Sequence, residues 1–135
     1  MAMLAVTESA SRALTRACDE AHPMEACGFL LGSVEGVATE VIMGRESAQE
    51  RDTFAIPDHE LRRVAAYAQD RGLRILALFH SHPSGSRDLS RGDRAALRYS
   101  AWPWVIVTRP SESSTAVLTF YAAGDALVLD HILLY

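Results

Sequence analysis

The chain has 135 residues, 49% of them hydrophobic and 22% charged, and its formal net charge is −4 with histidine neutral. These values fit one globular domain with a substantial core, and they exclude a disordered chain. The acidic balance and the scattered arginines argue against nucleic acid as the main partner, and no apolar run approaches the ~20 residues that span a bilayer.

The N-terminal residues 1–10 lack the basic start and the long apolar run of a signal peptide. The chain's only cysteines, Cys18 and Cys27, do not form a Cys-x-x-Cys pair. Both are expected to be packing residues, and nothing in the sequence around Cys27 would lower its pKa. A soluble protein in the reducing cytoplasm is therefore expected.

Residues 7–21 form the first predicted helix, because apolar side chains recur there every three or four positions. Thr7 or Ser9 is expected to cap its start, and His22-Pro23 to end it. The side chains expected on its inward face are Ala10, Ala13, Leu14, Ala17, Cys18 and Ala21.

A hairpin is predicted next, with a strand at residues 24–32, a tight turn at 33–36 and a returning strand at 37–43. Glu25 stands at the start of the first strand and has two interpretations. It is either a solvated connector between helix and strand, as most glutamates would be, or a general base for water at a metal site. This stretch alone does not decide between them.

Residues 44–52 are polar and predict a loop, and residues 53–56 predict a short strand. A second helix is predicted from Asp58 to about Asp70, with Gly72 as its stop. His59 in its first turn is expected to be exposed. The side chains expected on the inward face of this helix are Leu61, Val64, Ala65 and Ala68.

The apolar run at residues 75–79 predicts a buried strand that leads into His80-Ser81-His82. If the strand continues through both histidines, their imidazoles project to the same side, because successive side chains alternate between the two faces. Two neutral imidazoles side by side at a strand end suit a divalent metal.

Pro83 and Gly85 break this strand and start a loop that ends near Ser90. Asp93 follows three residues later, where a helix is predicted to begin, and its carboxylate can return to the histidines as an oxygen ligand. Three protein ligands leave the fourth tetrahedral position open, which is typical of catalytic zinc. Ser90 and Asp93 have an alternative interpretation as a capping box of that helix.

The rest of the chain predicts a helix at residues 91–99, a buried strand at 104–108 and a turn at 109–114. Residues 116–121 and 126–135 are expected to pair as a closing hairpin through Gly124-Asp125, with His131 packed on a strand face. The order of elements predicts a single α/β domain over residues 1–135, with a mixed sheet flanked by helices.

The sequence combines four of these features in a fixed order: Glu25, His80-Ser81-His82-Pro83, Ser90 and Asp93. Their order and spacing resemble the motif of the JAMM (MPN-plus) metalloproteases, which is Glu followed by His-x-His-Pro-x6-Ser-x2-Asp. The phrase HPMEACGFLLG is similar to the family's N-terminal signature. The resemblance implies a cytidine-deaminase-like fold and one zinc ion bound by His80, His82 and Asp93. It also implies that Glu25 is the general acid/base and that Ser90 stabilises the oxyanion.

The short connections and the lack of a further Cys/His cluster make the chain similar to the minimal prokaryotic members. The resemblance implies a peptidase or isopeptidase that cleaves after the C-terminal diglycine of a small ubiquitin-like or sulfur-carrier protein. A deconjugating enzyme of a bacterial ubiquitin-like (antiphage) system and a non-catalytic MPN-type scaffold remain alternatives. His-Pro-Ser-Gly also resembles RadC-type proteins, and Leu89 stands where many sulfur-carrier peptidases have proline.

Overall fold

The computed structural model describes residues 4–22, 24–33, 36–44, 48–50, 53–82, 89, 91–108, 117–121, 128–129 and 132–134. The helices are α1 (Glu8–Ala21), α2 (Asp58–Asp70) and α3 (Arg91–Arg98). The strands are β1 (Leu4–Val6), β2 (Cys27–Gly32), β3 (Val37–Met43), β4 (Ala48–Glu50), β5 (Thr53–Ala55), β6 (Arg74–His82), β7 (Trp104–Thr108), β8 (Val117–Tyr121), β9 (Val128–Leu129) and β10 (Ile132–Leu134).

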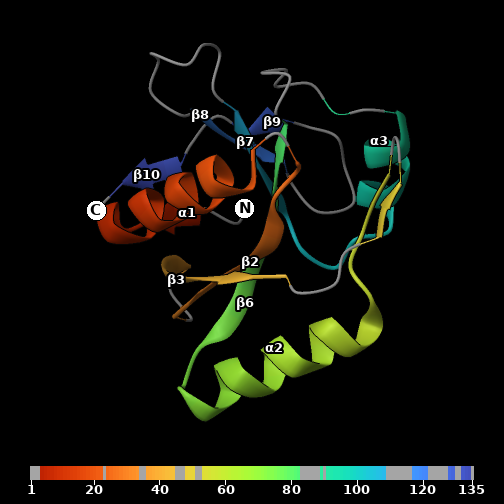
Figure 1. Cartoon of the computed structure of the whole chain (residues 1–135). Helices are drawn as coiled ribbons and strands as arrows, with labels where there is room; N and C mark the ends of the chain where they lie inside the picture. Colours follow the sequence, from red (N-terminus) through yellow and green to blue (C-terminus); the bar gives the residue numbers. More distant parts are fainter. Residues whose placement is uncertain are drawn as a thin grey trace.

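One mixed sheet runs through the molecule in the strand order β10-β1-β3-β2-β6-β7-β8-β9, and β4 and β5 pair separately. β6 is central: it pairs antiparallel with β2 on one side and parallel with β7 on the other. The predicted α/β architecture, a mixed sheet flanked by helices, is therefore confirmed (Figure 1).

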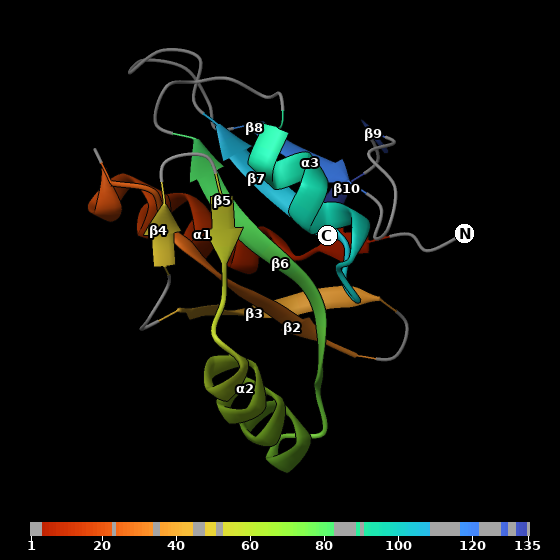
Figure 2. The same cartoon turned by 90° about the vertical axis from the view of Figure 1, so that its right-hand side faces the viewer.

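Each face of the sheet has its own core. On one face, Leu14 of α1 packs with Phe79 of β6 and Val105 of β7. On the other, Val64 of α2 and Leu97 of α3 belong to one cluster with Leu78 of β6. Figure 2 shows α3 in front of the upper part of the sheet and α2 below it, with α1 behind. β6 thus contributes side chains to both cores.

The ends of the predicted helices agree with the structure. The backbone N–H of Ala10 donates to Thr7 Oγ1 at 3.2 Å, so Thr7 caps α1. Gly72 adopts a φ of 69° just after α2, a conformation that side chains other than glycine rarely take. None of the described helices is long and apolar enough to cross a membrane.

Two side chains expected inside the helical faces are exposed instead, namely Ala13 and Ala65. In α2 the buried position is taken by Glu60, which is 2% exposed. Its carboxylate pairs with the guanidinium of Arg63 at 2.9 Å, and this partner offsets part of the cost of burying the charge. The buried stripe of α2 therefore consists of Glu60, Val64 and Ala68 and does not include Ala65.

The sheet edges differ most from the prediction. β1 was not expected, and β4 falls in the predicted loop at residues 44–52. The expected strand at 126–135 is two strands: β9 pairs with β8, as the predicted hairpin requires, but β10 pairs parallel with β1 at the other end of the sheet. The predicted turns at 109–114 and Gly124-Asp125, and His131, lie outside the described residues.

Candidate metal centre

The C-terminal end of β6 carries two of the three candidate ligands. The strand continues through His80 and His82, and it is paired there with β7, where His82 lies opposite Thr108. Because side chains alternate along a strand, both imidazoles lie on the face that also carries α3. His80 is 1% exposed, so its imidazole is inaccessible to bulk water.

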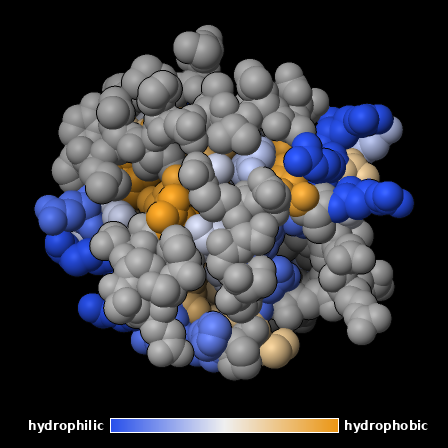
Figure 3. Space-filling model, turned by 90° about the horizontal axis from the view of Figure 1, so that it is seen from above, coloured by the Kyte–Doolittle hydropathy of each residue, from blue (hydrophilic) through white to orange (hydrophobic). Residues whose placement is uncertain are grey.

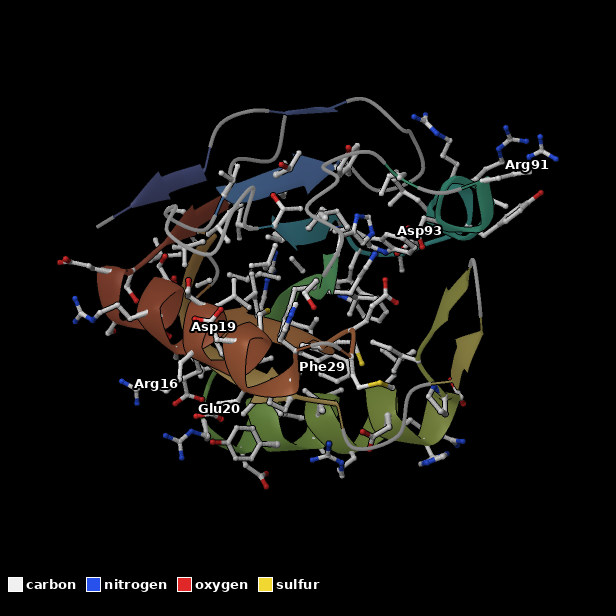
Figure 4. The ribbon with its side chains drawn as sticks, turned by 45° about the horizontal axis from the view of Figure 1, so that its top comes forward. Arg16, Asp19, Glu20, Phe29, Arg91 and Asp93 are labelled. Carbon is white, nitrogen blue, oxygen red and sulfur yellow. The ribbon has the colours of Figure 1, made fainter. Side chains whose placement is uncertain are left out.

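Asp93 comes from the first turn of α3. Leu97, four residues later, is buried in the same cluster as Leu78 of β6, and this spacing puts Asp93 on the same inward side of the helix. Figure 4 shows Asp93 on the side of α3 toward the sheet and Arg91 on the opposite side. A carboxylate in the first turn is also stabilised by the helix dipole.

The three side chains converge on one point. His80 Nε2 lies 3.1 Å from His82 Nε2, and Asp93 Oδ2 lies 3.5 Å and 3.3 Å from these two nitrogens. In a tetrahedral zinc site with bonds of ~2.0–2.1 Å, neighbouring ligand atoms are ~3.3–3.4 Å apart. The three atoms are therefore spaced as three corners of one zinc coordination sphere.

The chemistry of the donor set points the same way. A carboxylate oxygen and two imidazole nitrogens, each able to ligate a metal, lie in one buried cluster. A divalent cation can accept an electron pair from each of the three, and two histidines with one carboxylate form a common catalytic zinc set. The residues present fit the metal.

Neighbouring aromatic rings fix the orientation of His80. The indole of Trp104 on β7 meets the imidazole edge-on, with ring centroids 5.4 Å apart and an interplanar angle of 80°. The His82 ring lies on another side, 4.9 Å away between centroids. Trp104 is itself held by a hydrogen bond from Nε1 to Ser100 Oγ at 3.2 Å. These contacts restrict the orientation of the His80 imidazole.

Glu25 reaches this region through the pairing of β2 with β6. Cys27 lies opposite His80, and Ala26 forms two hydrogen bonds with Ser81, which is 55 residues away in the chain. Continuing the register two residues beyond Cys27 would set the backbone of Glu25 opposite His82. Directly opposed residues of an antiparallel pair project to the same face. This register assigns the half-buried glutamate to the face of the sheet that carries the candidate ligands.

The remaining predicted residues are less informative. Ser90 lies outside the described residues, so its predicted role stays a prediction. His59 is exposed at the start of α2, as expected. Cys27 is buried, and Cys18 packs against the core on the α1 side, which agrees with their expected packing roles. Burial raises the pKa of the Cys18 thiol to about 12, and a hydrogen bond with Ser81 works in the opposite direction.

Two neighbours of the site were missed from the sequence. Trp104 was expected only as part of a buried strand, and its contact with His80 depends on the parallel pairing of β6 with β7. The sequence assigns no role to Ser81, which appears there only within the motif. Strand alternation alone indicates that a residue between them faces the opposite side of the sheet, but not what it meets there.

The comparisons with known proteins agree with this geometry. The sequence profile of one family, described as prokaryotic homologs of the JAB domain, matches residues 7–121. A search of the curated proteins found no match.

Several solved structures share the fold. A protein from Desulfitobacterium hafniense, DSY2949, is 21% identical, with a TM-score of 0.84 over 98% of this chain and 93% of that one. AF2198 from Archaeoglobus fulgidus, a JAB1/MPN domain protein, is 20% identical, with a TM-score of 0.66 over the whole of both chains. A structure described as JAMM, a metalloprotease-like zinc site in the proteasome and signalosome, is 18% identical, with a TM-score of 0.62 over 99% of both chains.

Proposed function

The chain belongs to the family of prokaryotic homologs of the JAB domain, and from this we propose that it is a zinc-dependent peptidase or isopeptidase. The observation that carries the proposal is the convergence of His80, His82 and Asp93 at tetrahedral spacing. The pairing of β2 with β6, continued beyond Cys27, supports Glu25 as the neighbouring carboxylate. Three convergent candidate ligands favour a metalloenzyme over a binding scaffold.

In this proposal His80, His82 and Asp93 hold one zinc ion. The bound ion supplies Lewis acidity, which makes water a nucleophile near neutral pH and polarises the scissile carbonyl. Glu25 accepts the proton of the attacking water and returns it to the leaving amine, so one carboxylate serves as base and then as acid. Ser90 donates a hydrogen bond to the oxyanion of the tetrahedral intermediate.

The proposed substrate is a small ubiquitin-like or sulfur-carrier protein cleaved after its C-terminal diglycine. The complete motif in a chain with short connections supports this substrate class. Two glycines present no side chains, so the scissile bond can approach a deeply buried ion closely. Whether the leaving group is a sulfur metabolite or a conjugated protein is decided by the neighbouring genes: sulfur-carrier and cysteine-synthase genes, or activating and conjugating enzymes.

The outer face of α3, on the side of the helix away from Asp93, supports a docking surface for a protein substrate with acidic side chains. Arg91, Arg94 and Arg98 recur at helical spacing on the outer face of α3 and line a hollow of about 570 Å³ together with Ala95 and Tyr99. None of the three arginines forms an ion pair within the described part of the chain. Figure 3 shows hydrophilic side chains projecting on the side where α3 lies. This face is positive although the chain as a whole is acidic.

The test is cleavage of a ubiquitin-like fusion, with its diglycine at the junction, by the purified zinc-loaded protein. We expect wild type to cleave it, a chelator to stop the reaction, and added zinc to restore it. Glu25→Gln keeps the size of the side chain but removes its basicity, and should lower kcat by about 100- to 10,000-fold. Glu20→Gln, on the exposed side of α1, is the matched control. Equal cleavage by wild type and Glu25→Gln would remove Glu25 from the mechanism, and stoichiometric zinc without any cleavage would favour a scaffold.

A further inference from the structure

Ser81 lies between the two candidate ligands of β6, but its side chain faces away from them. Strand alternation turns it to the opposite face of the sheet, where it shares a side-chain hydrogen bond with Cys18 of α1. It is 6% exposed. It therefore contacts neither the metal nor a substrate at that metal, and any effect on catalysis must pass through another residue.

The contacts of Ser81 identify that residue. The backbone N–H of Ser81 donates to the carbonyl of Ala26 at 2.9 Å, and the N–H of Ala26 donates to Ser81 Oγ at 2.8 Å. Ala26 directly follows Glu25. The second bond is not a ladder bond between two backbones, because here a side-chain hydroxyl takes the place of a backbone acceptor.

The Ser81 hydroxyl can form its hydrogen bonds with Ala26 and Cys18 at the same time. Since the Ala26 N–H can only donate, Ser81 Oγ accepts there with a lone pair, and its own proton remains for the sulfur of Cys18. All three groups are buried or packed against the core of the α1 face, so water does not replace a lost partner. An alanine at position 81 would leave the Ala26 N–H without its acceptor in a dry environment.

We propose that Ser81 is a positioning residue that fixes Glu25 against the zinc ligands. Its hydroxyl and its backbone hold Ala26 at two points, and this locks the register between the segment of Glu25 and the strand of His80 and His82. The inference rests on the proposed role of Glu25 as the general acid/base. In this proposal β6 contributes His80 and His82 to the metal from one face of the sheet. From the other face, its Ser81 positions the segment that carries Glu25.

The test compares Ser81→Ala with Ser81→Thr in the full-length, zinc-loaded protein. We measure hydrogen exchange of the Ala26 amide by NMR, zinc content, and kcat and KM separately. Ser81→Ala should speed exchange of the Ala26 amide by at least ~10-fold. Because a displacement of ~1 Å can cost ~100-fold in rate, kcat should fall about 10- to 100-fold while KM and zinc content stay unchanged. Ser81→Thr retains the hydroxyl and should restore both amide protection and kcat.

A double variant separates positioning from a general loss of stability. If Ser81 acts through Glu25, Ser81→Ala lowers kcat in wild type but adds nothing in the Glu25→Gln background. Val6→Ala removes core volume on the α1 face of the sheet, away from the face of the candidate metal ligands, and should leave kcat unchanged. Ser81→Cys, in which a weakly accepting sulfur replaces the oxygen, gives the same test if the alanine variant does not fold.

Three results would overturn the inference: unchanged Ala26 exchange in Ser81→Ala, lost protection with unchanged kcat, or an equal fall of kcat in the Glu25→Gln background. Failure of the proposed function has a different signature, because wild type itself would then cleave nothing. In that case the exchange data alone decide whether Ser81 holds the segment of Glu25, with rescue by threonine supporting it and its absence refuting it.

Discussion

Asp93→Asn is the sharpest test of the metal centre, because it changes one ligand atom and almost no volume. The asparagine side chain fits the same space, and Leu97 still anchors α3 in the core. The amide lacks the negative charge and presents either a weak oxygen ligand or an NH2 group that cannot bind zinc. We expect the variant to fold like wild type and to lose most of its zinc affinity.

The expected size of the effect follows from mass action. Zinc at ~1,000 times its Kd stabilises the folded state by ~4.1 kcal/mol. With an unfolding entropy of ~2.1 cal/mol/K per residue, 135 residues give ~0.28 kcal/mol/K, so the melting temperature should rise by about 14 °C. If the substitution weakens binding ~1,000-fold, zinc is then near its Kd, and the rise shrinks to between 1 and 2 °C, on the order of 0.4 kcal/mol.

The assay is thermal unfolding with and without zinc, followed by circular dichroism, on wild type, Asp93→Asn and Asp70→Asn. Asp70 is an exposed carboxylate at the end of α2, so its substitution controls for a general loss of negative charge. A zinc-dependent rise in Asp93→Asn as large as in wild type would show that Asp93 is not a ligand. It would also show that the convergence of the three side chains has another cause.

The remaining predictions concern the reaction, the docking surface and the core. Ser90→Ala should lower kcat by about 100- to 1,000-fold with zinc content unchanged, since it removes one oxyanion donor; an unchanged kcat would exclude that role. Replacing Arg91, Arg94 and Arg98 together with glutamine should raise KM for a protein substrate at low salt but leave cleavage of a short diglycine peptide unchanged, and equal KM values at all salt concentrations would refute the docking surface. Cys18, with its pKa raised to about 12 by burial, keeps its proton in the native state while the unfolded chain loses it above its ordinary pKa of ~8.5. Stability should therefore fall from about pH 8.5 upward in wild type but less in Cys18→Ala, as measured by urea unfolding at pH 7, 9 and 10.

Sequence patterns predicted those parts of the fold that depend on local spacing. Alternation along the strand through His80 and His82 was enough to place both imidazoles on one face. The capping threonine of α1 and the stop at Gly72 were predicted from residue types with known backbone preferences. The buried face of α2 was predicted less well, because Glu60 is buried and Ala65 is exposed. Glu60 pairs with Arg63, and charged residues are rarely assigned to a buried face.

Local sequence patterns did not predict which strands pair when they lie far apart in the chain. β1 has three residues, too few for a periodic signal, and its partner β10 lies at the far end of the chain. Cys27 lies opposite His80 in a pairing whose register shifts between Leu30 and Leu31, and no local sequence pattern predicts this shift. The motif named Glu25 as a member of the site, but only the pairing of β2 with β6 explains how it gets there.

The candidate site depends on backbone pairing more than on its own side chains. Glu25 precedes β2, the histidines end β6, and the two strands are joined at this end by the bonds between Ala26 and Ser81. A shift of the β2–β6 register by one residue would turn Glu25 to the α1 face and Cys27 away from His80, because side chains alternate with a period of two. Since β2 is buried and paired on both sides, such a shift would also move Phe29 and Leu30 into the wrong cores. The two cores therefore hold the register, and through it the position of Glu25 relative to the candidate ligands.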